Sequence, residues 1–212
     1  VVDLIRGPKG SEVNLRILPE SGSSSGSPRV ISLIRNEVAL EAQAASKSVE
    51  TVTRNGREHR IGVIVLPTFY ADFAAARAGD TNYRSTTRDV ARLMRELADE
   101  NIDGLVIDLR GNAGGSLQEA ATLTGLFIDA GPIVQVVRSD GDREVLQDND
   151  GDISYQGPLT VLVDRFSASA SEIFAGAIQD YGRGLVVGEA TFGKGTVQTL
   201  VDLDRFMNRS SE

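Results

Sequence analysis

The sequence predicts an α/β fold. Three short apolar runs, at residues 61–66, 103–109 and 158–163, have the length and composition of buried strands. A helical pattern follows each run, and such alternation of strands and helices is typical of an α/β core. The chain has 212 residues, of which 41% are hydrophobic and 25% are charged, so it is long enough for one domain with a small appendage.

The first part of the chain predicts a small β-rich module over residues 1–38. Residues 1–6 have the pattern of a helix end, which leads us to expect a fragment whose targeting segment was lost. Apolar and polar residues alternate over 13–17, which predicts a strand, and a second strand is predicted over 30–34. A Gly/Ser-rich turn at 21–28 joins the two strands.

We expect residues 39–58 to be a polar, extended connector and residues 59–212 to form the core. Within this core, residues 85–100 predict an amphipathic helix, because apolar residues recur there at i, i+3, i+4 and i+7 and will pack inward. The other expected elements are a glycine loop at 111–115, a helix at 117–128, a strand from 131, an acidic hairpin-like excursion at 143–155, a helix after 166 and a strand at 185–188.

Charge and composition exclude several classes of function. The formal net charge of −8 argues against nucleic acid or an anionic membrane as a partner, because either would need a basic face. The chain has no cysteine, which excludes disulfides and thiolate nucleophiles, and no apolar run long enough to span a membrane. The one histidine, His59, lies in a polar stretch without the pattern of a catalytic triad.

Three serines, Ser167, Ser169 and Ser171, lie where the strand at 158–163 turns into a helix. Ser169 and Glu172 have the spacing of a capping box, which by itself explains the pattern structurally. A serine at such a turn also exposes its hydroxyl, so a nucleophilic role is compatible with the cap. The spacing leaves open which of the three serines would attack.

Lys194 lies between two glycines and is the candidate base for a serine hydroxyl. A lysine can accept a proton only if its surroundings disfavour the charged form, which requires burial. We expect Phe192 and Val197 to supply an apolar wall around it. The plain alternative is a surface lysine in a glycine turn.

Backbone amides offer a way to hold an oxyanion. The amide of Ala170 would lie at the positive end of the helix that follows the serines. The glycine loop in DLRGNAGG, residues 108–115, offers further amides from Gly114 or Gly115, although a tight turn with a helix entry explains the same letters.

Two other motifs are weaker. Residues 188–194 fit GxxxxGK, but a phosphate loop needs Ser or Thr next, where this chain has Gly195, and a helix where it has a strand pattern. The run Asp148, Asp150, Asp152 lacks the glycine and glutamate of a calcium loop, so we interpret it as a solvated loop.

Together, the motifs LIRGPKGSEV, DLRGNAGG, GPIVQV, DRFSASASEIFAGAIQDYGR and VVGEATFGKGTVQ resemble the tail-specific, or carboxy-terminal processing, serine proteases. The resemblance covers nearly the whole chain in order. It implies a core similar to the Clp-protease/crotonase superfamily, a β-spiral with outer helices. It also implies that residues 1–38 are the C-terminal part of a truncated PDZ-like domain.

The resemblance implies a Ser–Lys dyad, with Ser169 as nucleophile and Lys194 as general base. Gln198 would orient the lysine amine. Asp180 matches a position that is cast either as a third catalytic member or, as we expect, as a supporting residue. The remaining implied site residues are Ala170, Gly114 and then Gly115 for the oxyanion, and Glu172 and Thr191 for activity or substrate handling.

The function implied by the resemblance is a serine endopeptidase that acts on proteins recognised by apolar, unstructured C-terminal tails. It implies no cofactor and no nucleotide, a lipoprotein adaptor as an optional partner, and export to the periplasm with or without association with the inner membrane. Two alternatives stay open. One is a peptide-binding module with an inactive protease-like core, and the other is a crotonase-like acyl-CoA enzyme.

Overall fold

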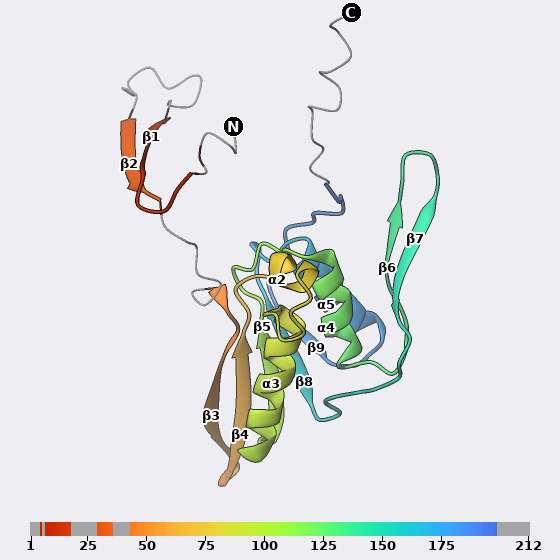
Figure 1. The fold of residues 1–212 in the computed structure, drawn as a ribbon. Helices are drawn as coiled ribbons and strands as arrows, with labels where there is room; N and C mark the ends of the chain where they lie inside the picture. Colours follow the sequence, from red (N-terminus) through yellow and green to blue (C-terminus); the bar gives the residue numbers. More distant parts are fainter. Residues whose placement is uncertain (1–4, 6, 18–28, 36–42, 199–212) are drawn as a thin grey trace, which may run out of the picture. The chain divides into compact units, whose positions relative to one another are not determined.

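The computed structural model describes residues 5, 7–17, 29–35 and 43–198 (Figure 1). The chain divides into two compact units, Val1–Ala42 and Gln43–Glu212. In the first unit, β1 (Glu12–Ile17) and β2 (Arg29–Ile34) form an antiparallel pair, so both predicted strands are confirmed. Most of the expected helix end at 1–6 and all of the expected turn at 21–28 lie outside the described residues.

The second unit is built on a five-stranded mixed sheet in the order β3-β4-β5-β8-β9 (Figure 1). β3 runs antiparallel to β4, and the other neighbours are parallel. Parallel strands need crossover connections, which the helices of the chain supply. The strands are β3 (Ser46–Arg54), β4 (Arg57–Val65), β5 (Gly104–Asp108), β8 (Leu159–Val163) and β9 (Leu185–Gly188).

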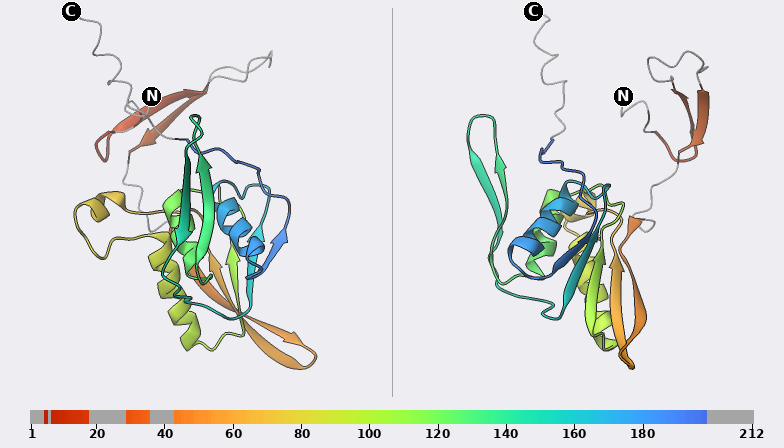
Figure 2. Two further views of the ribbon diagram at one scale, coloured as in Figure 1. Left: turned by 90° about the vertical axis from the view of Figure 1, so that its right-hand side faces the viewer. Right: turned by 180° about the vertical axis from the view of Figure 1, so that it is seen from behind.

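Helices α3 (Thr86–Asp99), α4 (Leu117–Gly125) and α5 (Ala170–Asp180) pack against one another and on the sheet (Figures 1 and 2). Beneath them lies a row of side chains that crosses three strands: Ile64, Ile107 and Val161 are paired in register and fully buried. The predicted helix at 85–100 is confirmed as α3, because its apolar positions pack into this core.

The strand β3 lies in the stretch that the sequence predicts to be a connector. It pairs along its whole length with β4 through the turn at Asn55 and Gly56, both of which have positive φ. Asn-Gly between two extended segments is a strong hairpin signal, and the polar, largely exposed side chains of β3 obscure it. The second compact unit begins at Gln43 and therefore includes β3.

Two further elements complete the second unit. β6 (Gly131–Val137) and β7 (Arg143–Asp148) form a separate hairpin that projects beyond α4 and α5 (Figure 2). The strand expected from 131 is thus confirmed, but the hairpin spans 131–148 and not the expected 143–155. The short helix α2 (Phe73–Arg77) is capped by Asp72, whose carboxylate accepts hydrogen bonds from two amides. In the part of the chain that the structure describes, none of the helices has both the length and the apolar character that crossing a membrane demands.

Replacement of Phe174 tests the packing between helix and sheet. Its ring is fully buried and meets the ring of Phe127 edge-on, with centroids 5.7 Å apart. We expect Phe174→Ala to lower the free energy of unfolding by about 3–5 kcal/mol, because it leaves a cavity. In urea denaturation, the matched control Phe73→Ala, whose side chain is 52% exposed, should change it by less than about 0.5 kcal/mol. Equal losses in the two variants would contradict this picture of the core.

Candidate active site

A tight turn between β8 and α5 positions the three serines. The turn is fixed by the carboxylate of Asp164, whose Oδ1 accepts hydrogen bonds from the amides of Gly111, Phe166 and Ser167 at 3.0, 2.9 and 3.1 Å. These bonds, led by the one from Gly111, hold the pKa of Asp164 below its usual value. One carboxylate thus joins the serine turn to the glycine loop that follows β5.

The structure separates the three serines by the bonds that they make. Ser167 and Ser171 are fully buried, and their hydroxyls donate to the carbonyl oxygens of Leu109 and Asn112, both at 2.8 Å. Ser169 is half-buried and has the arrangement of a capping box with Glu172, and its hydroxyl donates a hydrogen bond to none of the described residues. The amide of Glu172 donates instead to the carbonyl oxygen of Ser169, at 2.8 Å. Ser169 is therefore the serine whose hydroxyl is left available.

Ser169 also has a strained backbone. Its φ of 58° and ψ of −115° lie outside the regions that residues with a side chain normally adopt. Such conformations cost about 1–3 kcal/mol and persist only where the surroundings enforce them. Here the strain places a hydroxyl-bearing residue at the N-terminal end of α5, beside the free amide of Ala170.

Asn112 is a site residue that the sequence reasoning missed. Its side chain is fully buried, donates to the carbonyl oxygen of Leu66 at 2.7 Å and accepts from the amide of Gly114 at 2.9 Å. Its own carbonyl oxygen accepts from the amide of Ala168 at 3.0 Å and from the Ser171 hydroxyl. Asn112 therefore holds the glycine loop against the serine turn. The sequence signal that could have predicted this role is a single asparagine shortly after the buried strand β5.

The glycine loop lies directly against Ser169. A Cβ atom on Gly114 would be 2.9 Å from the Cβ of Ser169 and 3.1 Å from the amide nitrogen of Ala170. At Gly115, with φ of 144°, a Cβ would be 2.2 Å from the carbonyl oxygen of Phe69, so no side chain fits there. Glycine at both positions is thus required by close approach of the backbone.

The loop offers a different amide from the one that the resemblance puts first. The amide of Gly114 already donates to Asn112. Among the described residues, the amides of Gly115 and Ala170 have no hydrogen-bond acceptor, and both residues line the same cavity. The geometry therefore favours Gly115 over Gly114 as the partner of Ala170 in binding an oxyanion.

Glu172 joins the serine turn to the loop that carries Lys194. Its Oε2 accepts from the amides of Ser169 and Lys194 at 2.7 and 2.9 Å, and its Oε1 accepts from the Thr191 hydroxyl and the Gly193 amide at 2.8 and 2.6 Å. Burial alone would raise the pKa of Glu172, but these four donors outweigh it and hold the pKa below its usual value. The structure thus gives both Glu172 and Thr191 a positioning role.

Ser169, Lys194 and Gln198 lie around one cavity of about 170 Å³. Among the described residues, neither the Lys194 amine nor the Gln198 amide forms a hydrogen bond. Lys194 is exposed, as are the side chains of Phe192 and Val197, at 66% and 57%. The expected apolar wall around the lysine is therefore not formed by them. The cavity is lined by Gly115, Leu117, Ser169, Ala170, Ile173, Lys194, Thr196, Val197 and Gln198.

Asp180 lies away from this cavity. It is the last residue of α5 and is exposed, whereas Ser169 precedes the first. At a rise of about 1.5 Å per residue, the helix separates the two by about 16 Å. A role for Asp180 in direct contact with the reacting atoms has no support from this geometry, and sequence spacing could not show which end of the helix it would occupy.

Comparison with known proteins identifies the family. The profile of peptidase family S41 matches residues 60–210. The chain is 43% identical over 198 residues to the tail-specific protease of Haemophilus influenzae, a match that covers 93% of this chain and 26% of the relative. It is 35% identical over 199 residues to the carboxyl-terminal-processing protease of Synechocystis, a match that covers 94% of this chain and 42% of the relative. The chain belongs to peptidase family S41.

A solved structure agrees with this assignment. The photosystem II D1 C-terminal processing protease superposes with a TM-score of 0.66 at 30% sequence identity, over 94% of this chain and 49% of that one. The chain thus spans about a quarter to a half of the length of these relatives.

The strain at Ser169 predicts a difference in stability between two variants. Because glycine adopts positive φ without cost, we expect Ser169→Gly to be more stable to unfolding than Ser169→Ala by about 1 kcal/mol. Urea denaturation of both variants measures this. If Ser169→Ala were the more stable variant, the turn would not be strained.

The hydrogen bonds of Glu172 predict that replacing it lowers activity and makes the loss of stability depend on pH. A glutamine side chain would lack the charge that four donors stabilise, so we expect Glu172→Gln to lower the rate of cleavage about 100-fold and the free energy of unfolding by about 1–2 kcal/mol at pH 7. The Glu172 carboxylate has a lowered pKa. Its stabilisation is therefore complete above the ordinary glutamate pKa of about 4.3 and is lost as pH falls through the lower folded value.

The difference in unfolding free energy between wild type and Glu172→Gln should accordingly shrink between about pH 7 and pH 3, as measured by urea denaturation at each pH. Glu189→Gln is the matched control, since Glu189 is an exposed carboxylate close to the same loop. A difference that stays constant with pH, or that Glu189→Gln reproduces, would contradict the role given to Glu172.

Proposed function

We propose that this chain carries the catalytic site of a serine endopeptidase that processes the C-termini of polypeptides. The observation that carries the proposal is the state of Ser169, whose backbone is strained and whose hydroxyl, like the amides of Ala170 and Gly115 beside it, donates to no acceptor among the described residues. A serine with a purely structural role gains nothing from an available hydroxyl beside two available amides. A nucleophilic serine needs the hydroxyl for attack and the amides to bind the oxyanion. The names of the relatives support the same substrate class.

In the proposed mechanism, Lys194 removes the proton of the Ser169 hydroxyl as its oxygen attacks a peptide carbonyl carbon. The resulting oxyanion accepts hydrogen bonds from the amides of Ala170 and Gly115. Lys194 then gives the proton to the leaving amine, which departs as the new N-terminus. Water attacks the acyl-enzyme, and Lys194 again accepts and returns a proton, releasing the carboxylate product and free Ser169.

The exposure of Lys194 sets one condition on this mechanism. An amine acts as a base only when water no longer favours its charged form. We infer that a bound polypeptide covers the cavity of about 170 Å³ and removes this water, while Gln198, which lines the same cavity, orients the amine.

The remaining parts of the proposal concern the whole protein. We propose that the β1–β2 unit is part of a PDZ-like domain that binds apolar, unstructured C-terminal tails, and that the sheet with its helices is a crotonase-like core. Export to the periplasm and cooperation with a lipoprotein adaptor belong to the same proposal. The resemblance of the motifs to tail-specific proteases supports these points.

Cleavage of an unfolded polypeptide with an apolar C-terminus tests the dyad. We expect Ser169→Ala and Lys194→Ala in the intact protein each to lower the rate at least about 1,000-fold, because neither attack nor proton transfer remains. Lys47→Ala, which removes a lysine that pairs with Glu100 beside β3, should retain the wild-type rate. Substantial cleavage by Lys194→Ala would overturn the dyad.

Two measurements separate the alternatives. A fluorophosphonate probe that labels Ser169, as located by mass spectrometry, would exclude a peptide-binding module with an inactive core. Tight binding of CoA thioesters without any peptidase activity would instead favour an acyl-CoA enzyme, since a crotonase-like core also uses backbone amides to hold an oxyanion.

A further inference from the structure

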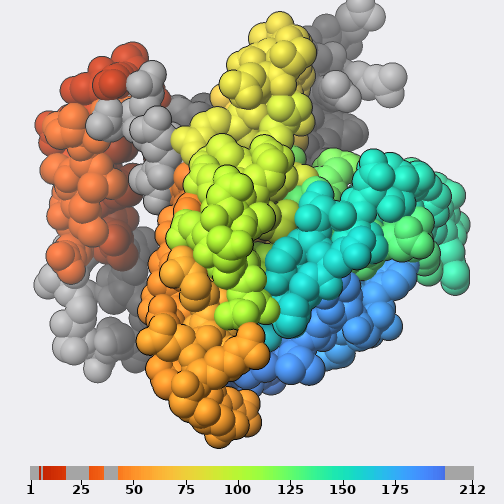
Figure 3. All heavy atoms as spheres, turned by 90° about the horizontal axis from the view of Figure 1, so that it is seen from below, coloured from red at the N-terminus to blue at the C-terminus, as the bar shows by residue number. Residues whose placement is uncertain are grey.

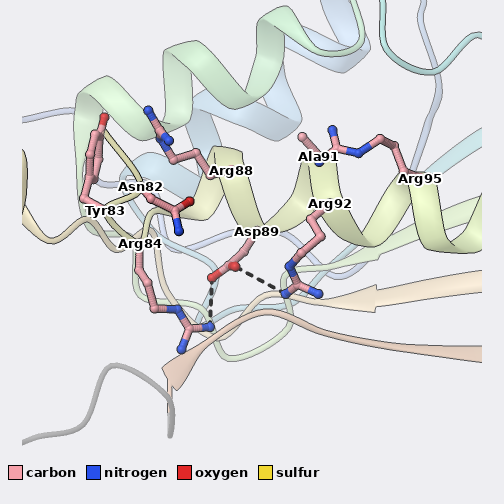
Figure 4. Close-up of a pocket in the computed structure, with 8 residues that line it drawn as sticks. All are labelled: Asn82, Tyr83, Arg84, Arg88, Asp89, Ala91, Arg92 and Arg95. Carbon is pink, nitrogen blue, oxygen red and sulfur yellow. Dashed lines mark hydrogen bonds and ion pairs between the residues drawn. The ribbon is translucent and has the colours of Figure 1, made fainter. Parts of the chain in front are cut away.

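The outer side of α3 and the turn before it carry a basic face, which we define as Arg84, which precedes the helix, and Arg88, Arg92 and Arg95 on it. The last three are spaced i, i+4 and i+7, so they project from one side of the helix. Together with Asn82, Tyr83, Asp89 and Ala91, they line a cavity of about 610 Å³ (Figure 4). This face is an exception in a chain whose formal net charge is −8.

Two carboxylates form ion pairs with two of the four arginines of this face. Asp89 pairs with Arg84 at 3.1 Å and with Arg92 at 3.3 Å, and Glu96 pairs with Arg92 at 2.6 Å. Asp89 is buried and also accepts a hydrogen bond from the Tyr70 hydroxyl at 2.6 Å. Asp89 and Glu96 thus pair with Arg84 and Arg92, and the other two guanidinium groups of the face have no carboxylate partner among the described residues.

Arg88 and Arg95 are the two arginines of this face without a carboxylate partner in the described part of the chain. Arg88 donates to the carbonyl oxygen of Thr81 at 2.7 Å and lies over the ring of Tyr83 at 4.4 Å, but it has no carboxylate partner among the described residues. Arg95 is exposed, and in the described part of the chain it has neither an ion pair nor a hydrogen bond. Figure 4 shows Ala91 between the two, so a small side chain leaves room beside both guanidinium groups.

The basic face continues into a groove that carries little charge. This second cavity of about 220 Å³ shares Ala91 and Arg95 with the first and is otherwise lined by Met94, Ala98, Ser154 and Tyr155. Figure 3 shows the turquoise segment around residues 150–158 alongside the yellow-green α3. A ligand that lies along α3 would therefore meet guanidinium groups first and then Met94 and the Tyr155 ring.

We propose that the basic face of α3 docks an acidic stretch of the polypeptide substrate, with an apolar side chain of that stretch in the adjoining groove. Arginine guanidinium groups bind carboxylates through paired hydrogen bonds, and Arg88 and Arg95 have no carboxylate partner among the described residues. The proposal rests on the proposed function in taking a polypeptide as the ligand. None of the residues of this face lines the cavity at Ser169, so docking here adds to recognition of the cleaved end.

Charge favours a short acidic peptide over the other polyanions. A nucleic acid carries phosphates along its whole length and binds through extended basic surfaces. Here only two arginines lack a carboxylate partner among the described residues, and they belong to a chain of net charge −8, which repels a long polyanion. A stretch with a few Asp or Glu residues and one apolar residue matches both the charge and the neighbouring groove.

Fluorescence anisotropy with the intact Ser169→Ala protein tests docking without cleavage. The probe is a fluorescein-labelled twelve-residue peptide with four Glu and two Leu, and its partner probe has Gln in place of every Glu. We expect the acidic peptide to bind at least about tenfold more tightly than the Gln peptide at low salt, and added salt to remove the difference. Arg88→Glu/Arg95→Glu should abolish the preference.

Arg54→Glu/Arg57→Glu is the matched control, since it makes the same charge change at two exposed arginines of the β3–β4 hairpin. We expect it to change the affinity by less than about twofold when both double variants are compared in about 0.1 M salt, where exposed charges separated by more than about 10 Å are largely screened. A preference that both double variants reduce equally would overturn the proposal, as would equal binding of the acidic and Gln peptides.

Three further outcomes separate this proposal from others. Displacement of the peptide by a DNA oligonucleotide of higher affinity would assign the face to nucleic acid and overturn the proposal. Self-association that is lost in Arg88→Glu/Arg95→Glu would assign it to a second copy, with the same result. With the catalytic serine restored, a substrate with an acidic stretch should show a higher KM in Arg88→Glu/Arg95→Glu at unchanged kcat. If wild type cleaves no substrate but still prefers the acidic probe, the proposed peptidase function fails while the docking face stands.

Discussion

The carboxylate of Glu172 is the interaction on which the candidate site depends. It lies in the first turn of α5, where the free amides of a helix favour negative charge. From there it accepts a hydrogen bond from Ser169 and three from the segment that contains Lys194. Among the described residues, that segment has one further bond to the serine turn, from the Phe192 amide to the carbonyl oxygen of Ser167. One charged group thereby relates the candidate nucleophile to the loop that carries its proposed base.

The parallel sheet explains why the other half of the site forms at the same place. β5 and β8 are parallel neighbours, so the loops that follow them leave the same edge of the sheet. One of these loops brings Gly115, and the other brings Ser169. Asn112 and Asp164 then bond across the two loops, which fixes the distance between the free amides and the strained serine. The chemistry of the site is thus a property of two adjacent loops on a rigid scaffold.

Local patterns predict the elements whose form is set by burial, such as α3, β5 and β8, because periodicity reports burial directly. β3 escapes prediction because its side chains are mostly exposed, and backbone pairing with β4 places it in the sheet. The choice of Ser169 over its neighbours followed from the family resemblance, since spacing alone could not make it. Three findings depend on how one loop lies against another, and a local sequence pattern does not report this. They are the preference for the Gly115 amide, the exposure of Lys194 and the burial of Asn112.

The segment from 189 to 198 contains no helix or strand and is joined to the rest of the site mainly through polar bonds to one glutamate. The apolar core lies elsewhere, beneath α3, α4 and α5. Cooperative melting of this protein is therefore dominated by the core, and release of the lysine segment should lower the free energy of unfolding by only about 1–2 kcal/mol, as expected for Glu172→Gln. Two preparations with similar calorimetric traces can thus differ in how many molecules have this segment in place, so titration with a probe of the proposed site counts them better than thermal stability does.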